Sequence, residues 1–148
     1  MATVDLTVGG TSGSLAANSG RVFTDMRELN FATTNRSSGD ILQLFDMPAG
    51  AFVQFVAYQV VTAEGGTLTF DIGLTGVDAD GFIDGANGNS TGYGCSAPFS
   101  LTEAAPNTIT GYGAGHLFTA TDTIDLLLNN DADAAVVRVW VVWMDFNP

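Results

Sequence analysis

The sequence predicts an all-β protein: a single-domain sandwich or barrel of the jelly-roll kind with an extended N-terminal arm. Short apolar segments alternate with turns rich in Gly, Asn, Asp and Pro, which is typical of such folds. No segment carries the 3.6-residue apolar period of a convincing amphipathic helix. The 148 residues, 46% of them hydrophobic, suffice for one core but not comfortably for two domains.

The first twenty residues are expected to form a short strand and an arm. Residues 4–8 (VDLTV) alternate apolar and polar side chains, as a strand does. Residues 9–20 (GGTSGSLAANSG) contain too few apolar side chains to pack and are typical of a flexible or extended segment. We therefore divide the chain into an arm, residues 1–20, and a β-sandwich domain, residues 21–148.

Four strands are expected in the next part of the chain. Residues 21–31 fit a helical stripe and a strand face alike, and we favour an extended conformation. Residues 41–45 form an apolar run, and residues 52–61 are β-branched and aromatic, as in a central strand. The turn Glu64-Gly65-Gly66 then leads into residues 67–74, where apolar and polar side chains alternate.

Residues 75–115 are rich in Gly, Asn and Asp, and we expect long surface loops there, with one strand near Phe99 and Leu101. Loops of this length in a compact domain usually serve function or assembly. Residues 116–118 are expected to begin a strand, and residues 123–128 to form another. About eight strands result, which suits a jelly roll.

The last strand, residues 135–146, is apolar on both faces. One face carries Val137, Val139, Val141 and Trp143, and the other carries Val136, Trp140, Val142, Met144 and Phe146, interrupted by Arg138. A strand with one solvated face should alternate more cleanly. We expect the core to cover one face, and a loop, the arm or a neighbouring subunit to cover the other. The candidate interface residues are Arg21, Arg27, Trp140, Val142 and Met144.

The charge balance excludes several partners. Sixteen acids face four arginines and no lysine, for a net charge of −12. Such a surface repels phosphate, so neither nucleic acid nor an anionic membrane is an expected partner. No apolar run approaches the roughly 20 residues of a membrane helix, and the first residues do not resemble a secretory signal. We therefore expect synthesis in a cytoplasm.

No catalytic constellation is recognisable, and we expect a protein that is not an enzyme. His116 is the single histidine and Cys95 the single cysteine, so familiar zinc ligand sets and an intrachain disulfide are ruled out. Residues 78–84 (DADGFID) partly match a calcium-binding loop, which makes Asp78, Asp80 and Asp84 candidate calcium ligands. The alternative is a tight turn with solvated carboxylates, and no cofactor is required.

Six segments together carry a resemblance to a known group of proteins. In order they are RVFTDMRELNF, DMPAGAFV, VVTAEGGTLTFDIG, VDADGFIDG, LFTATDTIDLLLNN and DADAAVVRVWVVW. Over residues 20–146 the chain resembles small virion structural proteins of tailed bacteriophages, and among these it is most similar to capsid decoration (cement) proteins.

The resemblance implies a capsid-surface protein made in the host cytoplasm. It implies an all-β subunit, commonly a homotrimer, that binds the major capsid protein, and it assigns no functional residue. The alternative is a tail or fibre component, or a glycan-binding β-sandwich, that contacts a host receptor through residues 75–115.

Overall fold

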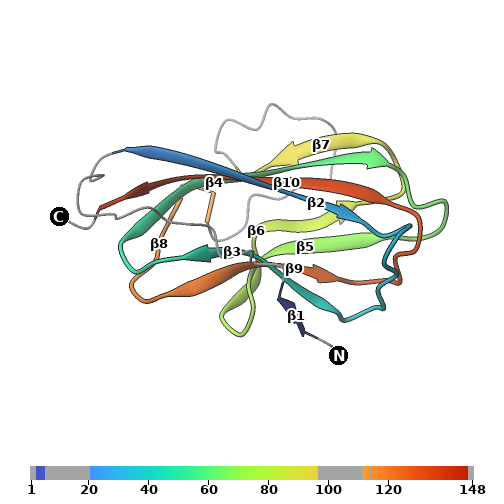
Figure 1. The fold of residues 1–148 in the computed structure, drawn as a ribbon, viewed down its shortest axis with the longest axis horizontal. Coiled ribbons are helices and arrows are strands. Elements are labelled where there is room, and N and C mark those ends of the chain that lie inside the picture. Colours follow the sequence, from blue (N-terminus) through green and yellow to red (C-terminus); the bar gives the residue numbers. More distant parts are fainter. Residues whose placement is uncertain (1–2, 6–20, 97–111, 114, 147–148) are drawn as a thin grey trace.

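A computed structural model describes residues 3–5, 21–96, 112–113 and 115–146 of the chain. These residues form ten strands and no helix, and the strands lie in two stacked sheets (Figure 1). The predicted all-β sandwich is therefore confirmed. Within the described ranges there is no helix with the length and apolar character needed to cross a membrane.

The first sheet, here called the β9 sheet, has the strand order β1-β3-β9-β5-β6. Its strands are β1 (Thr3–Asp5), β3 (Ile41–Met47), β9 (Asp122–Leu128), β5 (Thr69–Leu74) and β6 (Asp78–Asn87). All of its pairings are antiparallel except that of β1, which runs parallel to β3 at one edge.

The second sheet, here called the β10 sheet, has the strand order β2-β10-β4-β7. Its strands are β2 (Val22–Asn30), β10 (Val136–Asp145), β4 (Ala51–Thr62) and β7 (Gly92–Cys95). The two-residue strand β8 (His116–Leu117) pairs with the beginning of β4. The extended conformation expected for residues 21–31 and the strand expected at residues 116–118 are both confirmed.

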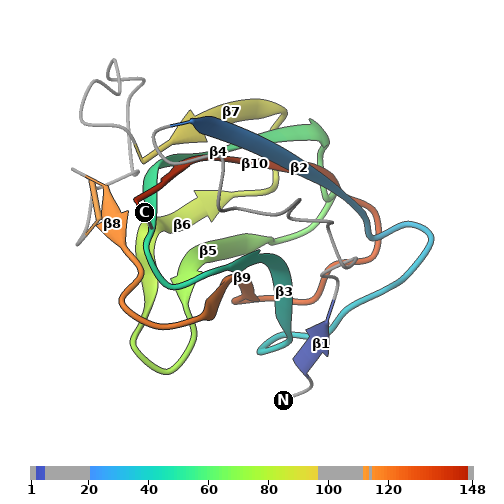
Figure 2. The ribbon, with the colours of Figure 1, turned by 60° about the vertical axis from the view of Figure 1, so that its left-hand side comes forward.

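The pairings nest in the manner of a jelly roll. Strand β2 pairs with β10, β3 with β9, β4 with β7 and β5 with β6. The chain therefore behaves as one long hairpin rolled over two sheets, and Figure 2 shows it crossing repeatedly from one sheet to the other. Strands β1 and β8 are additions to this eight-stranded arrangement.

The core lies between the sheets. On β10 the alternate residues Val137, Val139 and Val141 are completely buried, and they belong to one core cluster with fully buried residues of β9 such as Ile124 and Leu126. Phe23 stacks on Trp143 at 4.5 Å between ring centroids and closes one end of the core. One face of the final strand is thus covered by the opposite sheet, as the sequence predicts.

Residues 75–115 are not loops throughout, contrary to our expectation. Strands β6 and β7 lie inside this range. In β6 the residues Phe82, Ile83 and Ala86 are buried, and the strand pairs with β5. The glycines and aspartates that suggested loops occupy irregular positions of this pair, where the register shifts twice. Gly85, for example, has φ +62°, a backbone conformation that favours glycine. The strand predicted near residues 99–101 lies outside the described residues.

Candidate interaction surface

The β10 sheet turns a largely apolar face away from the core, and we call it the outer face. Side chains alternate along a strand, so the residues between the buried positions of β10 point outward together with their partners on β2 and β4. The apolar members are Val22, Met26, Phe52, Phe55, Ala57, Val136, Trp140, Val142 and Met144.

These outward side chains are accessible to different degrees. Trp140, Val142 and Met144 are half-buried among their neighbours, whereas Met26 is 43% exposed and Tyr93 of β7 is 79% exposed. The three β10 residues predicted to lie in an interface therefore share one surface.

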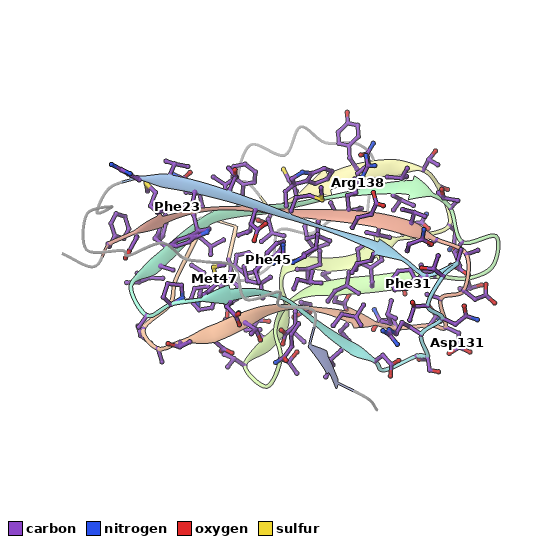
Figure 3. The ribbon with its side chains drawn as sticks, in the orientation of Figure 1. Phe23, Phe31, Phe45, Met47, Asp131 and Arg138 are labelled. Carbon is purple, nitrogen blue, oxygen red and sulfur yellow. The ribbon has the colours of Figure 1, made fainter. Side chains whose placement is uncertain are left out.

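The outer face is electrically neutral. Among the charged residues in the strands of the β10 sheet, only Glu28 and Arg138 point outward, and their side chains pair with Nε to Oε2 at 2.8 Å. Figure 3 shows Arg138 on the far side of this sheet from Phe45, which lies between the sheets. Both charged side chains are about two-fifths exposed.

The two other arginines predicted for the interface lie elsewhere. Arg27 alternates with the outward residues, so it lies on the inner side of β2, where its Nη1 contacts Asp25 Oδ1 at 3.1 Å. Its guanidinium also lies 5.5 Å from the ring centroid of Phe45. Arg21 is exposed and precedes β2. The structure thus does not bring Arg27 together with Trp140.

The β9 sheet, by contrast, is strongly acidic. Strands β3, β5, β6 and β9 contain no arginine or lysine, and every charged residue in them is an aspartate. These aspartates are Asp46, Asp71, Asp78, Asp80, Asp84, Asp122 and Asp125. The sandwich therefore has one sheet with a neutral, largely apolar outer face and one strongly acidic sheet.

The candidate calcium ligands Asp78, Asp80 and Asp84 all lie on strand β6. A side-chain hydrogen bond with Asp80 is the main reason that the pKa of Asp78 is raised, and burial and the charge of Asp80 add to it. No group of three or more metal-ligating side chains gathers within the described residues. The Asp78 carboxyl group therefore interacts with that of Asp80 on the same strand.

His116 lies in an aromatic cluster at one end of the sandwich. Its ring centroid is 4.0 Å from that of Tyr112 and 4.9 Å from that of Phe118. Burial lowers the pKa of His116, an effect that the charge of Asp122 partly opposes. The backbone N–H of Tyr112 donates to the carbonyl of Gly81, which fastens this segment to β6. The arrangement is a packing contact.

The Glu64 turn forms an open acidic pocket lined by Glu64, Gly65, Gly66, Thr67, Asp131, Asp133 and Ala134. Glu64 itself is buried. Its carboxylate accepts hydrogen bonds from three consecutive backbone N–H groups that lead into β10. These contacts hold the loop before β10 in place. The outer face is therefore the candidate functional surface, since the pocket's buried carboxylate is already engaged.

The fold is similar to that of chains in three solved phage capsid structures. For the acidic stable capsid of Helicobacter pylori bacteriophage KHP30 the TM-score is 0.58 at 12% identity, over 85% of this chain and 89% of the other. For the capsid of Ralstonia phage GP4 the values are 0.60 and 12%, over 88% of each chain. For the Cyanophage Pam1 capsid the TM-score is 0.55 at 21% identity, over 85% of this chain and 86% of the other.

The likeness establishes the fold. Because similar shares of both chains are covered in each comparison, the matched chains have about the length of this one. No protein-family model matches the sequence, and no curated protein matches it either.

Sequence reasoning located one strand of the outer face and missed its neighbours. Phe52, Phe55 and Ala57 on β4 and Met26 on β2 extend the surface of Trp140 sideways. The sequence did indicate that both faces of β4 could be apolar, because residues 52–61 contain no charged residue at either set of alternate positions. For β2 the alternation is masked by Asp25 and Arg27, which lie on the inner side.

Proposed function

We propose that this chain is a non-enzymatic structural protein of a phage virion. It decorates the capsid by binding the lattice of the major capsid protein, as a homotrimer. The observation that carries the proposal is the likeness in fold, over 85–88% of this chain, to chains of about the same length from three phage capsid structures. The sequence resemblance to decoration proteins points in the same direction.

The two unlike sheets suit a subunit of a decorated shell. A protein that binds the assembled lattice but not its separated subunits stabilises the shell by mass action. The acidic β9 sheet, turned to solvent, keeps particles that carry many copies apart by charge repulsion. The same acidity disfavours nucleic acid and anionic membranes as partners. The chain is made in the host cytoplasm and ends on the capsid surface.

Co-sedimentation with capsids tests this proposal. Purified chain is mixed with heads that lack it, and the heads are pelleted after washing. We expect saturable binding and a higher temperature for release of the packaged genome, because bound protein stabilises the assembled state. Heads that already carry the protein are the control and should bind no more. An empty pellet fraction at saturating protein contradicts the proposal.

The alternative is a tail or fibre component, or a glycan-binding sandwich that acts through residues 75–115. The feature that favours it is Tyr93, which lies in this range and is 79% exposed. An exposed ring of this kind can stack on a sugar. Under this alternative Tyr93→Ala removes glycan binding, and labelled antibody decorates tails rather than heads.

A further inference from the structure

We propose that copies of this chain associate through the outer face of the β10 sheet, with Trp140 near the centre of the contact. The number of copies, three, rests on the proposed function. In that homotrimer each subunit turns its outer face toward the common axis. The occupant of the apolar face is thus a second copy of the same chain.

The distribution of charge favours this occupant. A chain with net charge −12 repels its own copies wherever carboxylates would face each other. The β9 sheet presents aspartates without any cation of its own strands. The outer face presents one acid and one base, Glu28 and Arg138, that already neutralise each other. The outer faces of separate copies can therefore meet around a common axis without like-charge repulsion.

The size of the outer face is adequate for a specific contact. Strand β2 has nine residues, and at about 3.3 Å per residue it is about 30 Å long. The β10 sheet has four strands, which at about 4.8 Å spacing span about 19 Å. The flat area is thus roughly 570 Å² per copy, so three copies around one axis would bury on the order of 1,700 Å² in all, which is within the roughly 1,200–2,000 Å² of specific interfaces.

The composition of the outer face also fits an interface. Aromatic residues, methionine and arginine are enriched in contacts between proteins, and Trp140, Met26, Met144 and Arg138 supply them here. Soluble monomers rarely expose contiguous apolar patches larger than a few hundred Å². Burial of this patch against another copy removes that exposure while the acidic sheets stay in solvent.

Thr24 offers a variant that tests the contact without disturbing the core. It is exposed on the outer face and lies opposite Val142 in the β2–β10 register. Thr24→Asp places a carboxylate within the contact, beside Val142, where association would bury an unpaired charge. Val77→Asp adds the same charge at a residue that is 73% exposed outside the outer face, and it is the matched control.

Sedimentation equilibrium of the full chain measures the outcome. We expect the unaltered chain and Val77→Asp to form oligomers, and Thr24→Asp to associate about a hundredfold more weakly. Its circular dichroism and melting temperature should stay unchanged.

Two results would overturn the proposal. One is an unaltered chain that stays monomeric at about 100 µM, because an interface with a dissociation constant on the order of 1 µM would be mostly associated at that concentration. The other is undiminished association of Thr24→Asp. Capsid co-sedimentation is scored separately, so oligomers that fail to bind heads refute the proposed function and leave this inference standing.

Discussion

Replacing Glu64 with alanine should lower the free energy of unfolding by about 3 kcal/mol. The Glu64 carboxylate is buried, with the residue 5% exposed. It accepts hydrogen bonds from the backbone N–H groups of Asp133 at 3.0 Å, Ala134 at 3.1 Å and Ala135 at 2.7 Å. The turn after β4 is thereby joined to the residues that start β10.

The magnitude follows from the exposure of the three donors. Ala135 is completely buried, so its N–H would lose its partner without gaining water, at a cost of about 2 kcal/mol. Asp133 is exposed and Ala134 half-exposed, so water can replace much of their bonding, and each contributes about 0.5 kcal/mol. For a chain of this size the total corresponds to a melting temperature about 6–12 °C lower.

Urea and thermal denaturation followed by circular dichroism measure this loss. Asp131→Asn is the control, because it removes a charge from the same exposed loop while its amide oxygen can still accept the hydrogen bond from the Ser38 N–H. It should stay within about 0.5 kcal/mol of the unaltered chain. A loss below about 1 kcal/mol in Glu64→Ala would show that these hydrogen bonds do not hold β10 in register.

The same carboxylate makes stability depend on pH. Burial raises the pKa of Glu64, but the three backbone hydrogen bonds outweigh burial, and the net pKa lies below its ordinary value of 4.5. The stabilisation is therefore complete above about pH 4.5 and is lost as the pH falls through the lowered pKa. The Glu64→Gln variant should be less stable than the unaltered chain at neutral pH, and its free energy of unfolding should change less with pH in this acid range.

Three further outcomes are expected. Deletion of residues 1–20 should leave the sandwich folded, because only the three-residue strand β1 is lost from the described sheets. Attachment to the capsid should weaken. Unchanged attachment would show that the arm has no part in the proposed function. Because burial lowers the pKa of His116, stability should decline as the pH falls below about 6.5; His116→Gln should flatten that decline, and an equal decline in the variant would contradict this origin. Calorimetric titration with calcium should give no heat, since no described cluster supplies the six to eight oxygens that calcium takes; heat that disappears in Asp80→Asn would establish a site on β6.

The strands that could be predicted are those whose own side chains carry the signal. Residues 52–61, 67–74 and 123–128 are apolar or alternate cleanly, and they form β4, β5 and β9. Strand β6 escaped prediction because its aspartates and glycines resemble a turn. Burial of Phe82 and Ile83 against the opposite layer decides that it is a strand, and this is a tertiary contact.

The candidate surface divides in the same way. Both faces of the last strand are apolar in the sequence, so an apolar surface around Trp140 was predictable. The position of Arg27 was not, since β2 could not be assigned a face until its register with β10 was known. A shift of one residue in that register would exchange Arg27 and Met26 between the faces.

The amino-acid order by itself determined the fold class, the excess of acid and the apolar character of the final strand, because these depend on local pattern and composition. Only the tertiary structure separated the charges into one acidic sheet and one sheet whose outer face is neutral. Which strands become neighbours is decided by pairing between segments as far apart as β2 and β10, and no local pattern records it. That separation is what turns an acidic chain into one with a face on which its own copies can meet.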